Sequence, residues 1–335
     1  MTMTYALPSL PDGWFVETYS VSIDGRLARM SATVDMQTRL TALRDTSISW
    51  PEELGTLIAA HTRARIEVFK GSELIDALEF PLETLFPKFD RLSDGRWVVA
   101  NARRWGDTNA RILAPDGALL SRLSLGDAIE HLQCDAMGGI WVGYFDEASG
   151  KEPPGAYGVN RFRADGTIWS SPNSGLEPPI YDCDAMTVGP DGVWLCYYAD
   201  FPIVHVAFGG ALRQWRNDAI RGPCVVAADG ALAVLLGGYE KEAGTGALLR
   251  LGDDGYAGVL HRFALEPAML TAVNNGFVFA RGANVHFVED GVWTIITVED
   301  FAAALASSPP RFPTYVPSPE EESEPAGPGW TLKDR

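Results

Sequence analysis

The chain has 335 residues, 46% of them hydrophobic, and its 44 acidic and 27 basic side chains give a formal net charge of −17. So acidic a chain repels phosphate backbones and anionic lipid, which argues against nucleic-acid and membrane partners. The acidity favours solubility, and it also suits cations or basic partners.

The cysteines and the N-terminal segment bear on the cellular compartment. Cys134, Cys183, Cys196 and Cys224 form no CxxC pair and lie in apolar stretches, where cysteine behaves as a small hydrophobe. Residues 1–11 contain no signal-peptide pattern. No apolar run approaches the roughly 20 residues that cross a bilayer. We therefore expect a reducing, cytoplasmic location.

Residue pairs that favour tight turns recur along the chain. Asp-Gly or an equivalent pair stands at 24–25, 94–95, 116–117, 138–139, 165–166, 191–192, 209–210, 229–230, 254–255, 275–276 and 290–291. Such pairs tolerate φ > 0 and close β-hairpins. Taken two at a time with their flanking strands, they define units of about 35–50 residues, the period of propeller blades.

These units predict an all-β fold, a six-bladed β-propeller of four-stranded antiparallel blades, as a single domain over residues 1–308. The blades are expected at about 14–80, 89–125, 130–170, 181–215, 224–265 and 269–298. Blade 1 carries an insertion in which 49–52 has the spacing of a capping box before a short helix, and 300–305 suggests another helix. The Pro- and Glu-rich composition of 309–335 predicts a disordered tail.

One phrase occurs twice in the middle of the chain. Cys-Asp-Ala-Met stands at 134–137 and at 183–186, and each copy leads into a turn and an apolar strand that contains Trp141 or Trp194. The recurrence predicts one structural unit laid down twice, with both copies on inner strands. Both tryptophans are then expected in the core.

Blade topology predicts which face carries function. The turns between the first and second and between the third and fourth strands are mostly tight Asp-Gly hairpins, whereas the remaining connections are longer and chemically richer. Function concentrates on loops held by a rigid scaffold. Carboxylates with aromatic rings around one mouth suit a polar or cationic small molecule, although the same residues also suit a rim and blade packing. The candidate ligand-binding residues are Arg103, Asp127, Glu130, Tyr144, Asp146, Glu147, Asp182, Tyr197, Tyr198, Asp200 and Tyr239.

The repeated acids Asp135 and Asp184 are candidate metal ligands. From the inner strands they would share Ca²⁺ or Mg²⁺ with Asp90 or Glu130. The alternative is that each acid braces a neighbouring turn or backbone amide. His131 lies near Glu130 in sequence and is the candidate general base, or else a surface hydrogen-bond partner.

Several familiar catalytic patterns are missing from the sequence. It contains no GxSxG, GxGxxG before a helix, P-loop or HExxH, so serine-hydrolase, nucleotide-fold and zincin interpretations have no support.

The blade phrases themselves carry a family resemblance. Gly138-Gly139-Ile140-Trp141 and Asp191-Gly192-Val193-Trp194 resemble the Asp-Gly-x-Trp blades of streptogramin-lyase-like, NHL-type and SMP-30/gluconolactonase-like propellers. Residues 126–133, 144–147 and 197–202 are similar to segments of uncharacterised bacterial, notably actinobacterial, propeller proteins. The resemblance covers about 85–295 and implies the architecture. The SMP-30-like metal ligands and the lyase's histidine pattern are not matched in this sequence.

Three functions follow as hypotheses. The first is a cytoplasmic propeller that binds a small polar ligand or a protein partner at the face formed by the longer connections, with no required cofactor. The second is a metal-dependent hydrolase or lyase of the lactonase-like kind, using Ca²⁺ or Mg²⁺ and His131. The third is an interaction scaffold that uses the rim and the acidic tail.

Overall fold

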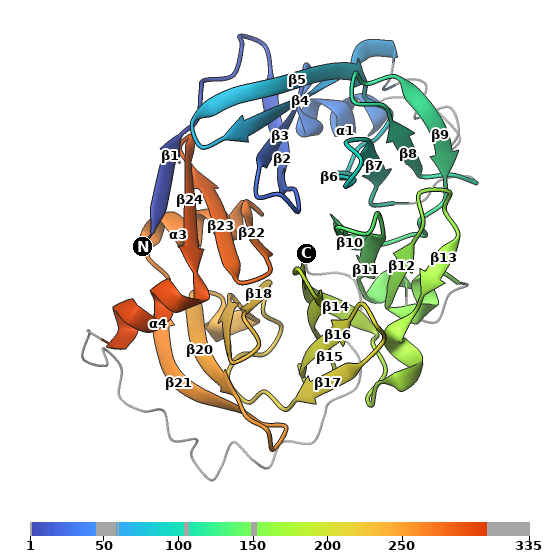
Figure 1. The fold of residues 1–335 in the computed structure, drawn as a ribbon. Helices are drawn as coiled ribbons and strands as arrows, with labels where there is room; N and C mark the ends of the chain where they lie inside the picture. Colours follow the sequence, from blue (N-terminus) through green and yellow to red (C-terminus); the bar gives the residue numbers. More distant parts are fainter. Residues whose placement is uncertain (1, 45–57, 59, 104–106, 149–152, 307–335) are drawn as a thin grey trace.

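The computed structural model describes residues 2–44, 58, 60–103, 107–148 and 153–306. In this part of the chain the strands form six four-stranded antiparallel sheets, which stand in a ring as the blades of a β-propeller (Figure 1). We call the axis of this ring the channel. The predicted fold class is confirmed. Blades 1–5 are continuous meanders whose first strand lies innermost.

Five blades are each built from consecutive strands. Blade 1 contains β2 (Phe15–Val21), β3 (Leu27–Ala32), β4 (Arg63–Lys70) and β5 (Glu73–Pro81), and blade 2 contains β6 (Pro87–Arg91), β7 (Trp97–Asn101), β8 (Ala110–Leu113) and β9 (Leu119–Leu123). Blade 3 contains β10 (Ile129–Cys134), β11 (Ile140–Tyr144), β12 (Val159–Phe162) and β13 (Ile168–Ser170). Blade 4 contains β14 (Asp182–Val188), β15 (Gly192–Tyr198), β16 (Ile203–Ala207) and β17 (Leu212–Trp215), and blade 5 contains β18 (Val225–Ala228), β19 (Leu232–Leu236), β20 (Thr245–Leu251) and β21 (Ala257–Ala264). The Asp-Gly turns close these hairpins as the sequence indicates: Gly95 and Gly117 have φ of 91° and 89°, a region that glycine enters without steric cost.

Blade 6 joins the two ends of the described chain. It consists of β22 (Val278–Arg281), β23 (Asn284–Glu289), β24 (Val292–Thr297) and the N-terminal strand β1 (Met3–Ala6), which pairs with β24. The sequence did not predict β1. The expected start of blade 6 at Met269 is also wrong, because 267–274 forms the helix α3 (Pro267–Asn274), with proline at its first position and Met269 buried. Asn275-Gly276 follows this helix and leads into β22 instead of closing a hairpin.

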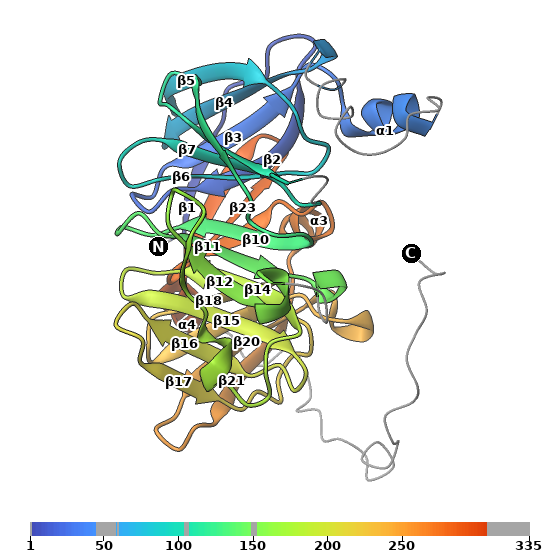
Figure 2. The same ribbon diagram turned by 90° about the vertical axis from the view of Figure 1, so that its right-hand side faces the viewer.

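The two faces of the ring differ. We call the side with the turns between first and second and between third and fourth strands the hairpin face, and the opposite side the loop face. The loop face carries α1 (Met36–Arg44), α3, η1 (Asp146–Ala148), η2 (Gly155–Tyr157), η3 (Pro172–Gly175) and η4 (Glu240–Glu242) in its connections. Figure 2 shows α1 and α3 on the same side of the ring. The helix α4 (Val298–Ala306) confirms the one expected at 300–305, whereas the capping box at 49–52 lies outside the described residues.

The core lies between the blades. Each of the six clusters of buried apolar side chains joins two neighbouring blades, so burial of apolar surface holds the ring together seam by seam. Trp141 and Trp194 are 1% and 4% exposed, which confirms their expected place in the core. No helix in the described ranges is long and apolar enough to cross a membrane.

Candidate functional site at the mouth of the channel

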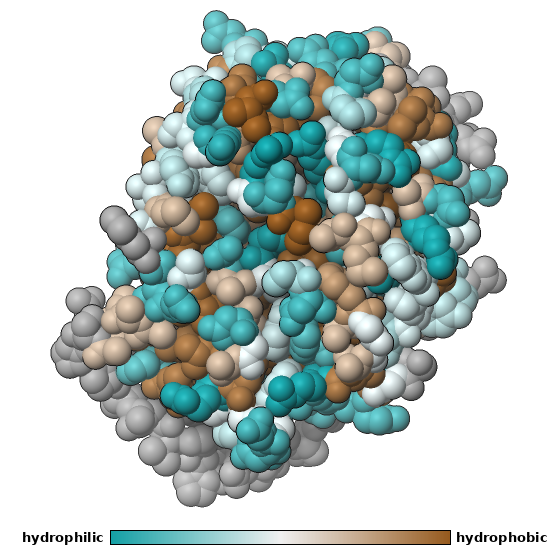
Figure 3. All heavy atoms as spheres, in the orientation of Figure 1, coloured by the Kyte–Doolittle hydropathy of each residue, from teal (hydrophilic) through white to brown (hydrophobic). Residues whose placement is uncertain are grey.

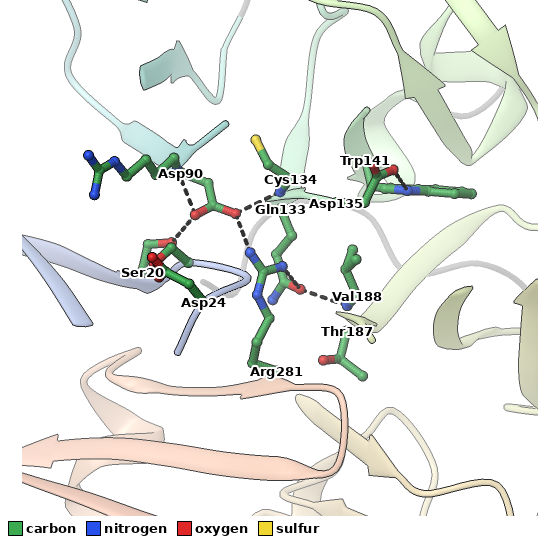
Figure 4. A network of polar contacts seen from close by, with 12 residues as sticks. Ser20, Asp24, Asp90, Gln133, Cys134, Asp135, Trp141, Thr187, Val188 and Arg281 are labelled. Carbon is green, nitrogen blue, oxygen red and sulfur yellow. Dashed lines mark hydrogen bonds and ion pairs between the residues drawn. The ribbon is translucent and has the colours of Figure 1, made fainter. Parts of the chain in front are cut away.

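A buried ion pair crosses the channel at the hairpin face (Figure 4). Arg281, at the end of β22, donates from Nη2 to Oδ2 of Asp90 on β6 at 2.8 Å, and both side chains are almost fully buried. Asp90 also accepts hydrogen bonds from the Ser20 hydroxyl at 3.0 Å and from the backbone N–H of Cys134 at 2.6 Å. One carboxylate therefore ties together the inner strands of blades 1, 2, 3 and 6.

Gln133 and Thr187 extend this network to blade 4. Oε1 of Gln133 accepts from Nη1 of Arg281 at 3.1 Å and from the N–H of Val188 at 2.7 Å. The Thr187 hydroxyl accepts from the N–H of Gly282 at 2.9 Å. Figure 3 looks onto this face, where hydrophilic and hydrophobic side chains both reach the centre. Because these groups bind one another, we assign the hairpin end of the channel a structural role.

Asp135, the first of the repeated acids, lies in the turn between β10 and β11 at the hairpin face and is fully buried. Its Oδ1 accepts from the N–H groups of Met137 at 2.8 Å and Gly139 at 2.9 Å. Its Oδ2 accepts from Nε1 of Trp141 and from Nε of Arg161, each at 2.8 Å. Asp135 is thus a brace that holds the turn and two strands of blade 3, the alternative that the sequence left open.

Asp184, the second repeated acid, occupies a different position in its blade. Gln133 pairs with Trp141 in blade 3, whereas Thr187 pairs with Trp194 in blade 4. The first phrase therefore falls at the end of an inner strand and the second near the start of one. The expectation of one unit laid down twice is wrong for these phrases. Trp141 and Trp194 occupy matching positions in their blades, and the two Cys-Asp-Ala-Met phrases do not. Asp184 consequently faces the loop side.

The loop-face end of the channel carries a cluster that we call the mouth site: Glu130, His131, Asp182, Asp184, Tyr198 and Tyr239. Tyr239, in the loop between β19 and β20, donates its hydroxyl proton to Oδ1 of Asp184 at 2.5 Å. Nε2 of His131 lies 3.0 Å and 3.1 Å from the carbonyl oxygens of Cys183 and Asp184. Both oxygens are acceptors, so Nε2 carries the proton. Blades 3, 4 and 5 thus meet at Asp184.

The carboxyl of Asp184 is electrostatically unusual. Burial is the main reason that its pKa is raised to about 7, and the nearby Asp182 and Glu130 raise it further, while the hydrogen bond from Tyr239 lowers it. Its Oδ2 is buried and has no hydrogen-bond partner in the part of the chain that the structure describes. Eleven buried side-chain atoms of the described residues have no hydrogen-bond partner, and this oxygen is the one among them that belongs to a carboxylate.

Two further groups set the charge of the mouth site. Burial lowers the pKa of His131 against the opposing effect of Glu130, so the imidazole is neutral at neutral pH and Nδ1 keeps a lone pair. Burial acts to raise the pKa of Glu130, but the ion pair that Glu130 forms with Lys88 on β6, at 3.7 Å, helps to hold that pKa below its ordinary value. Lys88 was missed because its pairing with Glu130 depends on the contact between two inner strands.

An aromatic wall stands beside Asp184. The ring centroids of Tyr198 and Phe201 lie 5.8 Å apart, and those of Phe201 and Tyr239 lie 5.6 Å apart, both edge to face. Tyr198 is 49% exposed. Asp200 and Phe201 have φ of 66° and 48°, a region that costs energy for residues with side chains and that concentrates at functional sites.

Four predicted residues form a second group on the loop face. Nε of Arg103 pairs with Asp127 at 3.2 Å, and Nη1 of Arg103 pairs with Glu147. The Arg103 guanidinium lies over the Phe145 ring at 5.5 Å, and Asp146 precedes Glu147 in η1. Arg103 is therefore paired with two carboxylates of this group, those of Asp127 and Glu147.

Tyr144 and Tyr197 lie at the loop-face ends of β11 and β15, and both are fully buried. Their hydroxyls donate to the carbonyl oxygens of Leu125 at 2.5 Å and Pro178 at 3.0 Å, and burial raises the pKa of both phenols. Both rings serve blade packing, which is the alternative that the sequence left open.

The two candidate metal ligands do not share a site. Asp135 lies at the hairpin face and Asp184 at the loop face, at different ends of their inner strands. Among the described residues, no group of three or more His, Cys, Asp or Glu side chains is arranged to hold a metal ion.

The chain is a six-bladed β-propeller, and its likeness to known proteins is one of shape. No protein-family model matches the sequence, and no curated protein matches it significantly. A catalytically inactive virginiamycin B lyase from Staphylococcus aureus, solved with quinupristin, is 12% identical over 89% of this chain and 99% of its own, with a TM-score of 0.46. Hsv2 of Kluyveromyces lactis is 10% identical over 84% of this chain and 74% of its own, with a TM-score of 0.48. Identity this low transfers neither activity nor ligand.

Proposed function

We propose that this propeller binds a small polar molecule at the mouth site. The observation that carries the proposal is the buried Oδ2 of Asp184, which has no partner within the described part of the chain. Asp135, the acid with the same neighbours in sequence, has both oxygens occupied by four donor groups. A partner for Asp184 would then come from outside the described residues, and we propose that it is a ligand.

The geometry around the site supports a small ligand. At the hairpin face Asp90 and Arg281 are buried and bind each other, so we expect a molecule to approach from the loop face. There it would meet Asp184, the exposed ring of Tyr198 and the lone pair on His131. An apolar wall with a few directed polar groups is the usual composition of a small-molecule site.

A hydrolase or lyase of the lactonase-like kind is the second candidate. It is favoured by the Asp184 carboxyl, whose pKa of about 7 suits proton exchange at neutral pH, and by the neighbouring His131. Any divalent cation would need ligands beyond these two residues. Loss of lactone hydrolysis in both Asp184→Asn and His131→Gln, with normal folding, would support this candidate over binding alone.

Binding is tested by screening small polar compounds for their effect on thermal unfolding. A ligand of the mouth site should raise the Tm of the wild type and lose most of that effect in Asp184→Asn and Tyr198→Ala. Tyr256→Ala is the matched control, because Tyr256 is 40% exposed and lies beside the turn between β20 and β21, on the hairpin face. Compounds that stabilise all four proteins equally, or native mass spectra and a screen that find no ligand at all, would contradict the proposal.

A further inference from the structure

The other buried carboxylates show what Asp184 lacks. Four acids with buried side chains each have an arginine partner at 2.6–2.8 Å: Glu17 with Arg39, Glu67 with Arg29, Asp90 with Arg281 and Asp135 with Arg161. Within the described ranges, no lysine or arginine forms an ion pair with Asp184. Its strongest charged neighbours are instead the carboxylates of Asp182 and Glu130, which repel a second negative charge. Among the described residues, each of these four acids thus has a cation as its partner, and Asp184 has none.

The groups around Asp184 also suit a positive charge. Oδ1 is occupied by the Tyr239 hydroxyl, so Oδ2 remains to accept a hydrogen bond. The rings of Tyr198, Phe201 and Tyr239 stand beside it, and aromatic faces attract organic cations. The His131 ring is neutral and does not repel such a guest.

We propose that the occupant of the mouth site is a small organic cation, a protonated amine whose ammonium group donates to Oδ2 of Asp184 and whose carbon chain contacts Tyr198. This inference rests on the proposed binding function and specifies its ligand class. A charged hydrogen bond to a buried carboxylate is the strongest single contact that the site offers. A neutral or anionic molecule of the same shape would bring no positive charge to the Asp184 carboxylate.

Binding of an ammonium ion is coupled to the proton on Asp184. The titratable groups that face this carboxyl are Tyr239 from the loop after β19, Glu130 and His131 from β10, and Asp182 and the Cys183 and Cys196 thiols from blade 4. The cation favours the carboxylate, so it lowers the pKa of Asp184 and displaces its proton. Below pH 7 the amine must compete with that proton, and its affinity falls up to about tenfold per pH unit.

The test uses the full chain with n-propylammonium, methylammonium and tetramethylammonium chlorides, n-propanol as the neutral control and sodium chloride at equal ionic strength. At pH 8 n-propylammonium should raise the Tm of the wild type, and calorimetry near pH 7 should detect proton release that changes with the buffer's ionisation heat. Asp184→Asn should weaken binding by about ten- to a hundredfold. Tyr239→Phe removes a hydrogen bond that lowers the pKa of Asp184, so the pH midpoint of binding should move upward.

The outcomes separate the ligand class from the binding function itself. If n-propanol and n-propylammonium stabilise the protein equally, and both effects depend on Asp184, the ligand is not an organic cation but the binding site stays supported. If the screen finds a neutral or anionic ligand and no ammonium probe has an effect, the proposed ligand class is wrong and the binding site again stays supported. If neither the screen nor these probes detect binding, both proposals fail.

Discussion

Replacing Asp135 by asparagine tests whether this acid is a brace. The asparagine side chain has the same size but only one acceptor oxygen. The two oxygens of Asp135 accept from four donor groups. Either the turn amides or the pair formed by Trp141 and Arg161 loses its acceptor. The Arg161 side chain is 3% exposed, so its charge would stay buried without a partner. Removing one member of such a pair costs about 3–5 kcal/mol.

Urea denaturation measures this loss, and Arg161→Met separates the charge from the hydrogen bonds of the turn. We expect Asp135→Asn to lower the free energy of unfolding by about 3–5 kcal/mol. The double variant should lose less than the sum of the single changes, by roughly 1–3 kcal/mol, because no unpaired charge remains. A loss below about 1 kcal/mol for Asp135→Asn, or strict additivity of the two changes, would refute the brace.

Three other changes probe the core, the network and the mouth site by thermal and urea unfolding. Trp141→Ala and Trp194→Ala should each cost about 3–5 kcal/mol, and near-wild-type midpoints would contradict their burial. Arg281→Met should cost about 3–5 kcal/mol because it leaves the Asp90 carboxylate buried and unpaired, and an unchanged midpoint at pH 7 would show that the ion pair is dispensable. Asp184→Asn should act in the opposite direction. The folded pKa of Asp184 lies above its unfolded value, so its contribution to stability is present at low pH and is lost as the pH rises from about 4 to 7. The free energy of unfolding of the variant should therefore be higher than that of the wild type at pH 8, by an amount on the order of 2–4 kcal/mol, and equal to it near pH 4. A variant that is less stable than the wild type at pH 8 would count against the raised pKa.

Most of the fold was predictable because propeller blades are local structures. Their hairpins are closed by turn pairs such as Asp94-Gly95 and Asp116-Gly117, and such a turn can be recognised from about four consecutive residues. Closure of the ring is not local. The strand β1 pairs with β24 almost the whole chain away, and four residues without a neighbouring turn carry no strand signal of their own. The Arg281–Asp90 pair joins residues 191 positions apart and was equally invisible.

The candidate site was predicted in part, for the same reason. Glu130, His131, Asp182, Tyr198 and Tyr239 were chosen because they fall in long connections or at their edges, and blade topology directs those connections to one face. Topology does not indicate which of these side chains meet. The contact between the Tyr239 hydroxyl and Asp184 depends on how blade 5 sits against blade 4.

The repeated phrase explains why residue type alone does not decide function. Asp135 and Asp184 have the same neighbours in sequence, yet their strand register differs because apolar burial of Trp141 and Trp194 sets it. Register then decides which cations each acid can reach. Arg161 lies on the strand that pairs with β11 and can meet Asp135, whereas Asp184, near the start of β14, meets a tyrosine hydroxyl and other acids. Asp135, whose cation comes from its own blade, is a brace, whereas Asp184, which has no cation among the described residues and a raised pKa, is the acid for which we propose a ligand.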